Sequence, residues 1–166
     1  ALGRQLGLPR HDLRSLAMGC MLMDVGKLRV DPSLLQAARP LSEGEADRMR
    51  EHVAHGVDIV RESGMMNQDV IDIVAHHHER FDGSGYPQGL AGDQVPAFAR
   101  IAAIVDTYDA VTSTRSHAPA VSPSDAIKLL YQSRNIEFQA ELVEVFIQAV
   151  GIYPAGTIVE LTTGEV

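Results

Sequence analysis

Cysteine and aromatic residues are scarce in this sequence, and tryptophan is absent. The 166 residues include one cysteine, and aromatic side chains make up 5% of the chain. Because the thiol of Cys20 has no second cysteine to pair with, an intrachain disulfide framework is excluded and a reducing compartment is favoured. The apolar neighbours of Cys20 predict a buried thiol over a reactive one.

Long hydrophobic runs and basic residues are also lacking. No apolar stretch reaches the roughly 18 residues that a transmembrane helix needs, so no membrane segment is predicted. Lysine and arginine together number 14, against 22 aspartates and glutamates, which gives a formal charge of −8. A chain this acidic, with no basic block, is a poor candidate for binding polymeric nucleic acid or an anionic membrane.

The size and hydrophobic content fit one globular domain. Hydrophobic residues make up 45% of the chain, which is enough for one sizeable core, so residues 1–166 are expected to form a single domain. The chain starts at Ala1 without an initiator methionine or a recognisable signal peptide, and it stops at Val166 in a strand-like or turn-like segment. We therefore expect a domain cut from a longer polypeptide.

Helical periodicity dominates the sequence. Leu13, Leu16 and Cys20 recur at three- and four-residue steps, and Gly26 is the expected end of their helix. Caps and apolar stripes predict further helices in six places. These are a short stretch after Asp31, then about 43–63, 68–78, 96–111, 123–133 and 141–150.

Two segments break the helical pattern. Residues 81–92 contain four glycines and a proline, which predicts a loop from 81 to about 96. Only residues 157–162 alternate like a strand, so a short β segment is expected over 157–166. The predicted fold class is therefore all-α, a helical bundle with a small β-strand or hairpin appendage at the C-terminus.

Histidine, by contrast, is abundant, with seven in the chain, and His76, His77 and His78 are consecutive. Adjacent histidines on a helix point about 100° apart, so two of them reach one metal only near a helix end. Imidazole and carboxylate ligands without thiolates favour iron, manganese, zinc, nickel or cobalt. The candidate ligands of these types are Asp24, His52, His55, His77, His78, Glu79, Asp82 and Asp106.

Five segments, in order along the chain, resemble the motifs of one family. The run His-His-Glu-Arg-Phe-Asp-Gly-Ser-Gly-Tyr-Pro, from His77 to Pro87, is similar to the signature of HD-GYP domains. These domains are a branch of the HD superfamily of metal-dependent phosphohydrolases. The other matching segments are Met23–Lys27, Glu51–Gly56, Arg100–Arg115 and Gly151–Gly156.

The resemblance implies a bacterial, cytoplasmic, all-helical domain that hydrolyses cyclic di-GMP to linear pGpG or GMP. It implies two or three divalent metals, commonly iron or manganese. By position, Asp24 would be the carboxylate that bridges two metals. His52, His77 and His78 would complete the protein ligands of one metal, and Asp106 would bind the other.

The resemblance also implies a substrate site. Lys27 would contact a substrate phosphate, a role that suits its compact point charge. Arg115 would bind a phosphate or a guanine edge, and Tyr86 with the loop around Gly85 would shape the pocket wall. Taken by residue type alone, two alternatives remain: Lys27 as a cation at a helix C-terminus, and Arg115 as a surface ion-pair partner.

Three departures from the family pattern bear on activity. Met23 stands where the family has the histidine of its His-Asp pair; a thioether is a poor ligand for hard or borderline metals, and Met23 is expected to pack as a hydrophobe. Further family ligands lie on a preceding helix, which would fall before Ala1. We therefore expect one metal to bind firmly and a second weakly or not at all. Ser116–Ala118 replaces a Pro-Tyr-basic run, which removes one expected phosphate contact.

Two functions remain open at this point. The first is an active metal-dependent cyclic di-GMP phosphodiesterase, for which the Met23 change lowers the expected turnover. The alternative is a degenerate HD-GYP domain that acts in bacterial signalling as a nucleotide-binding or protein-interaction module, for example with a diguanylate cyclase (GGDEF-type) domain. The retained ligands, Lys27 and the complete Gly-Tyr-Pro loop favour the first function, and Met23 favours the second.

Overall fold

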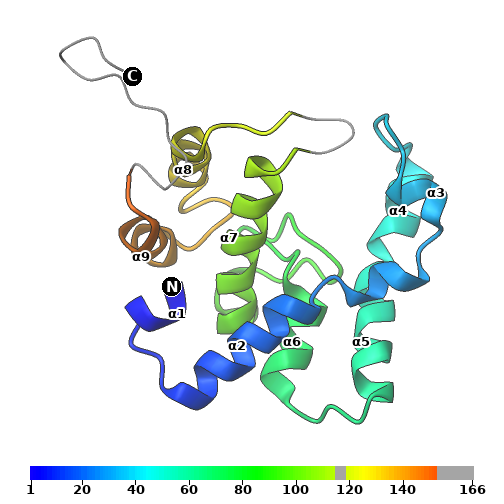
Figure 1. Cartoon of the computed structure of the whole chain (residues 1–166), viewed down its shortest axis with the longest axis horizontal. Coiled ribbons are helices and arrows are strands. Elements are labelled where there is room, and N and C mark those ends of the chain that lie inside the picture. Colours follow the sequence, from blue (N-terminus) through cyan, green and yellow to red (C-terminus); the bar gives the residue numbers. More distant parts are fainter. Residues whose placement is uncertain (115–118, 153–166) are drawn as a thin grey trace.

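The computed structural model describes residues 1–114 and 119–152, and their regular structure is helical (Figure 1). The α-helices are α1 (Leu2–Gln5), α2 (Arg10–Leu22), α3 (Pro32–Leu35), α4 (Glu43–Arg50), α5 (His52–Glu62), α6 (Gln68–His76), α7 (Ala97–Thr112), α8 (Pro123–Gln132) and α9 (Ala140–Val150). Two 3-10 helices, η1 (Val25–Arg29) and η2 (Gly92–Gln94), complete the set. The predicted all-α class is confirmed. The β segment predicted over 157–166 lies outside the described residues.

Helix α7 runs through the middle of the molecule (Figure 1). Helices α8 and α9 lie on one side of it, and α6 packs against its other side, with α5 beyond α6. Helix α2 packs mainly on α6, and α1 reaches α9. The chain therefore brings α2, α5 and α7 around the single helix α6.

Helix α6 is held by two hydrophobic clusters, one on each side. Ile73 belongs to the larger cluster, which draws on α1, α2, α7, α8 and α9. Val70 and Val74 belong to a smaller cluster with Val60 of α5. Ile73, Val70 and Val74 are fully buried, and full burial of such a side chain contributes about 1.5–3 kcal/mol. The end of α6, where the histidine run begins, is thus fixed from both sides.

The capping predictions for two helices are confirmed. Asn67 starts α6, because its side-chain oxygen accepts the Val70 N–H at 3.2 Å. Glu45 accepts the Ser42 N–H at 2.9 Å at the start of α4. Each bond satisfies a backbone donor that the helix itself leaves unpaired.

The continuous helix expected over 43–63 is wrong, because it breaks at Glu51 between α4 and α5. At this break the carbonyl of Met49 lies 2.7 Å from Nδ1 of His52. A side chain that hydrogen-bonds to a backbone carbonyl in the last turn of a helix competes with the backbone hydrogen bonds that would continue the helix. The break places His52 at the first position of α5.

The expected role of Gly26 as a helix end is also wrong. Helix α2 ends at Leu22, and Gly26 lies inside η1. A Cβ at Gly26 would overlap the carbonyl oxygen of His52 and the backbone nitrogen of Gly56. Glycine is therefore needed because η1 packs backbone to backbone on α5, and this contact brings the start of η1 next to His52.

Candidate metal centre

Four of the predicted ligands converge on one point. Asp24 precedes η1, His52 begins α5, and His77 and His78 follow α6. Each offers one ligand atom, and these atoms all lie within 4.8 Å of one another. Bond lengths of about 2.0–2.2 Å give a coordination shell about 4–4.4 Å across, so the four atoms are nearly at coordinating separation. We call these four residues the ligand cluster.

The end of α6 allows two adjacent histidines to share this point. Helix α6 stops at His76, and His77 is its C-terminal cap residue. The ring centroids of His77 and His78 are 4.0 Å apart, and the rings of His52 and His78 are 5.1 Å apart. The expectation that the histidine run needs a helix end to bring its rings together is confirmed.

Backbone carbonyls orient two of the imidazoles. Nδ1 of His52 lies 2.7 Å from the Met49 carbonyl, and Nδ1 of His77 lies 3.1 Å from that of Val74. A carbonyl can only accept, so both Nδ1 atoms carry the proton and both Nε2 atoms keep a lone pair. A metal-ligating histidine typically has this arrangement of its second ring nitrogen.

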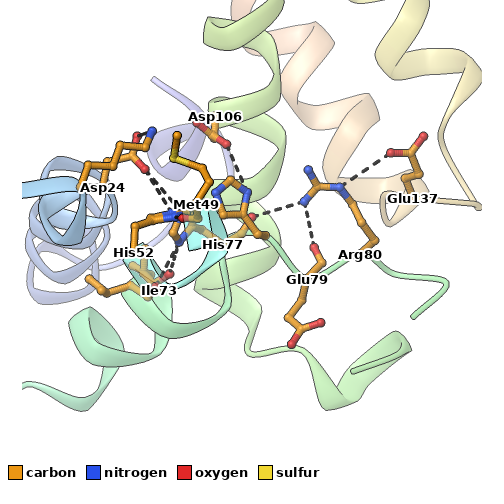
Figure 2. A network of polar contacts seen from close by, with 12 residues as sticks. Asp24, Met49, His52, Ile73, His77, Glu79, Arg80, Asp106 and Glu137 are labelled. Atoms are coloured by element: carbon orange, nitrogen blue, oxygen red, sulfur yellow. Dashed lines mark hydrogen bonds and ion pairs between the residues drawn. The ribbon is translucent and has the colours of Figure 1, made fainter. Parts of the chain in front are cut away.

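The lone pairs point at a carboxylate oxygen without bonding to it. Figure 2 shows the side chains of Asp24, His52 and His77 turned toward one another. Oδ1 of Asp24 lies 3.5 Å from Nε2 of His52 and 3.9 Å from Nε2 of His77. All three atoms are buried, and no group among the described residues hydrogen-bonds to any of them. Three converging acceptors fit a cation, which would pair with all of them at once.

Burial keeps these imidazoles uncharged at neutral pH. It lowers the pKa of His52, and it lowers the pKa of His77 to about 4 against the opposing charge of Asp24. Burial, followed by the proximity of His77, lowers the pKa of His78 to about 2. A neutral imidazole offers a lone pair to a metal without first losing a proton.

A cavity of about 500 Å³ opens beside the ligand cluster. Lys27, His52, His78 and Tyr86 line it, together with apolar side chains of the α3–α4 segment. Nζ of Lys27 lies 2.6 Å from Oδ2 of Asp24. The ring of Tyr86 stacks on that of His78, with centroids 4.7 Å apart and planes 25° apart. A cation, an aromatic wall and the ligand cluster thus share one hollow.

Residues 1–142 match the family model described as an HD domain. The chain belongs to the HD domain family. It is 36% identical over 165 residues to cyclic di-GMP phosphodiesterase PA4108 of Pseudomonas aeruginosa, which covers 99% of this chain and 40% of that protein. It is 33% identical over 148 residues to 3'3'-cGAMP-specific phosphodiesterase 2 of Vibrio cholerae, which covers 89% of this chain and 28% of that protein.

A solved structure shares the fold of this HD domain. Bd1817, a HDG"Y"P protein from Bdellovibrio bacteriovorus, superposes with a TM-score of 0.71 at 21% identity, over 90% of this chain and 47% of that one. The family that the motifs predicted is confirmed. The chain spans two fifths or less of the length of the two phosphodiesterases described above. Among the helices of the described residues, none is long and apolar enough to cross a membrane.

The remaining predicted ligand of the HD domain lies beside the cluster. Oδ2 of Asp106, on α7, is 3.9 Å from Nδ1 of His78, but Asp106 is not one of the four converging residues. Met23 packs against the larger hydrophobic core, as expected for a hydrophobe. Burial, followed by the charge of Asp106, raises the pKa of Cys20 to about 11, which agrees with an unreactive thiol. Arg115 lies outside the described residues.

Three candidate ligands chosen by residue type lie outside the cluster. Glu79 is buried, but its carboxylate accepts the backbone N–H groups of Gln88 and Leu90. The carboxylate of Asp82 accepts from Ser84, and His55 lies 3.9 Å from Glu51. Their residue types fit a metal, but their surroundings satisfy them in other ways.

Gly85 has a structural reason to be glycine. A Cβ there would overlap the backbone of His78, Glu79 and Arg80. The loop of the HD domain therefore lies directly on the end of α6. Sequence reasoning missed Arg39, which lines the 500 Å³ cavity and forms two 2.8 Å bonds with Glu45. Its only sequence signal is its position three residues before the Ser42 cap.

Replacing His52 with glutamine should abolish most of the metal affinity. Loss of an orienting partner alone typically costs about 10–100-fold in metal affinity, and His52→Gln removes a ligand itself. Differential scanning fluorimetry with manganese should show a rise in the Tm of the native chain and little rise for His52→Gln. His55→Gln, on the same helix but outside the cluster, is the control and should behave like the native chain. An equal rise in Tm with manganese for His52→Gln and His55→Gln would show that His52 is not a metal ligand.

Proposed function

We propose that this domain binds a cyclic dinucleotide beside a divalent metal and hydrolyses one phosphodiester bond. The observation that carries the proposal is the cavity in which His52 and His78 of the ligand cluster meet Lys27 and Tyr86. Hydrolysis of a phosphodiester needs a positive charge that neutralises the phosphate and, next to it, a metal that activates water. In this cavity Lys27 would supply the first, and the ligand cluster would hold the second. The phosphodiesterases to which the chain is similar support cyclic di-GMP as the substrate, with 3'3'-cGAMP as the related alternative.

Iron or manganese suits the proposed ligand set. Three neutral imidazoles and a carboxylate, without thiolate, match the borderline and hard cations. When bound, such an ion lowers the pKa of a water molecule and polarises a phosphoryl oxygen. We assign Asp24, His52, His77 and His78 to the firmly held metal and Asp106 to a weaker second position.

Lys27 is the proposed phosphate-binding residue. Its ammonium lies 2.6 Å from Oδ2 of Asp24, and both side chains are partly exposed. Asp24 thereby holds the ammonium at the edge of the cavity and leaves Oδ1 directed at the imidazoles. A lysine held in this way adds a fixed positive charge beside the ligand cluster, where the substrate phosphate would lie. Arg115 would add a second contact.

The remaining cavity wall suits a nucleobase. Leu34, Leu41 and Met49 give an apolar surface, and Tyr86 gives an aromatic one. Stacking of a base on an aromatic ring is worth about 1–3 kcal/mol. We infer that one base of the dinucleotide lies against this wall, with its phosphate directed toward Lys27.

The context of the domain is part of the same proposal. The motif series from Met23 to Gly156 supports a single HD-GYP domain over residues 1–166. The relatives named above are longer bacterial proteins, which supports further domains in the whole protein. The resemblance to HD-GYP domains is the ground for proposing a cytoplasmic signalling role. A cyclic dinucleotide is the proposed ligand, and a diguanylate cyclase domain is a candidate partner.

Lys27→Ala should strongly reduce turnover of cyclic di-GMP. Loss of one preorganised electrostatic group typically lowers the rate by about 100- to 1,000-fold. The measurement is kcat/KM for cyclic di-GMP and for 3'3'-cGAMP with manganese. Lys128→Ala is a matched control, because Lys128 also pairs with an aspartate three residues earlier but lies on α8. Similar kcat/KM values for the two variants would contradict the role of Lys27.

The packing of Met23 favours a second candidate function. Met23 is partly buried and packs against the larger hydrophobic cluster, and its thioether is a poor ligand for a second hard or borderline metal. The domain would then bind metal and nucleotide but turn over slowly, and act through its partners. This alternative differs from the first in metal content and rate, and not in the ligand bound.

Met23→His separates these two functions. If the missing imidazole limits the centre, the native chain should hold about one manganese, and Met23→His should hold about two and turn over faster. Metal analysis after gel filtration gives the count, and product chromatography gives the rate. Met21→His is the control, because Met21 is 85% exposed on the same segment. Two firmly held ions in the native chain, with full turnover, would contradict the impairment.

A further inference from the structure

The carboxylate of Glu79 is a buried charge outside the ligand cluster. Glu79 is 1% exposed, and in Figure 2 its carboxylate points away from Asp24 and His77. One oxygen accepts the Gln88 N–H at 2.8 Å, and the other accepts the Leu90 N–H at 3.1 Å. A buried carboxylate is costly unless such charge-assisted bonds satisfy it. Glu79 therefore binds its own chain.

The two N–H groups belong to the outgoing limb of the glycine-rich loop. This limb begins just after Tyr86, whose backbone N–H donates to the His78 carbonyl at 3.2 Å. The loop is thus tied to the end of α6 at Tyr86 and again, through Glu79, at Gln88 and Leu90. Pro87 alone lies between Tyr86 and Gln88, so the Glu79 bonds hold the backbone immediately after Tyr86.

Tyr86 separates two cavities. Its ring stacks on His78 and lines the 500 Å³ cavity beside the ligand cluster. It also lines a larger cavity of about 720 Å³, together with Arg50, Val53, Ile71 and other residues of α4, α5 and α6. Arg50 lies 5.4 Å from the centre of the Tyr86 ring. Any shift of the loop would therefore change both cavities.

We propose that Glu79 is a positioning residue, whose carboxylate anchors the Gln88–Leu90 limb and so holds Tyr86 on His78 as the wall between the two cavities. His78 and Glu79 are neighbours in the chain, so one short segment places a ligand-cluster imidazole and also the aromatic ring that covers it. The effect on substrate rests on the proposed function, whereas the anchoring itself does not.

The first test needs no ligand. In the metal-free chain, NMR measures the His78 ring-proton shifts, which report the stacked Tyr86 ring, and the exchange rates of the Gln88 and Leu90 amides. Glu79→Gln keeps one acceptor oxygen but replaces the other with an NH2 donor, so one of the two amides loses its partner and should exchange about tenfold faster or more. The His78 shifts should move toward those of Tyr86→Leu, which defines the unstacked state.

Asp82→Asn is the matched control within the same loop. Asp82 accepts from Ser84 in an exposed turn, and asparagine keeps that acceptor. This variant should retain the native His78 shifts. If Glu79→Gln fails to fold, Glu79→Asp replaces it, because aspartate keeps the charge but is one methylene too short to reach both amides. Native shifts and native exchange rates in a folded Glu79 variant would overturn the proposal.

A double-mutant cycle tests the consequence for substrate. The KM for cyclic di-GMP should rise about tenfold in Glu79→Gln, with a smaller change in kcat. Adding Glu79→Gln to Tyr86→Leu should have little further effect, because the two residues act through one ring. If the effects of Glu79→Gln and Tyr86→Leu on KM were additive, Glu79 would not act through the Tyr86 ring, and the proposal would be overturned. A native chain that neither binds nor cleaves the dinucleotide would refute the proposed function, but the NMR result would still decide the anchoring.

Discussion

Three buried polar atoms that face one another without a hydrogen bond impose the central constraint on this domain. They are Oδ1 of Asp24 and the Nε2 atoms of His52 and His77, and no group within the described residues hydrogen-bonds to any of them. Because all three are acceptors, they cannot satisfy one another, and an unsatisfied buried acceptor costs about 1–3 kcal/mol. A bound cation removes this cost for all three together. The fold therefore acts as a scaffold that holds these acceptors together, which supports the proposed metal site.

The scaffold holds them by three kinds of contact from separate parts of the chain. The close approach of Gly26 to α5 brings Asp24 next to His52. Two hydrophobic clusters hold α6 and so fix His77 at its end. Carbonyls of Met49 and Val74 orient the imidazoles. None of these contacts depends on the metal, so the site is preorganised. The hydrophobic packing of the core offsets the free-energy cost of burying these unpaired polar atoms.

Much of this arrangement is readable in the sequence, because periodicity, caps and motif spacing are local signals. The loop over 81–96, the Asn67 cap and the all-α class follow from them. The family motifs also select the four residues that converge, Asp24, His52, His77 and His78. The break at Glu51 is not readable, because it depends on the direction that the His52 ring takes toward the Met49 carbonyl. The role of Gly26 is not readable either, because it arises from η1 meeting α5 across more than twenty residues of chain. The contacts of Glu79 are not readable either. Its residue type suits a metal ligand, and only the path of the loop after Tyr86 brings the Gln88 and Leu90 N–H groups to its carboxylate. Arg115 and the segment 157–166 lie outside the described residues.

The position of a bound ion tests the central claim most directly. Crystals of the chain grown with manganese would give an anomalous difference map that locates the metal independently of any assay. We expect one strong peak at about 2.0–2.2 Å from Oδ1 of Asp24 and from the Nε2 atoms of His52 and His77. A manganese peak elsewhere, or a map in which these three atoms surround no metal, would contradict the assignment of the ligand cluster.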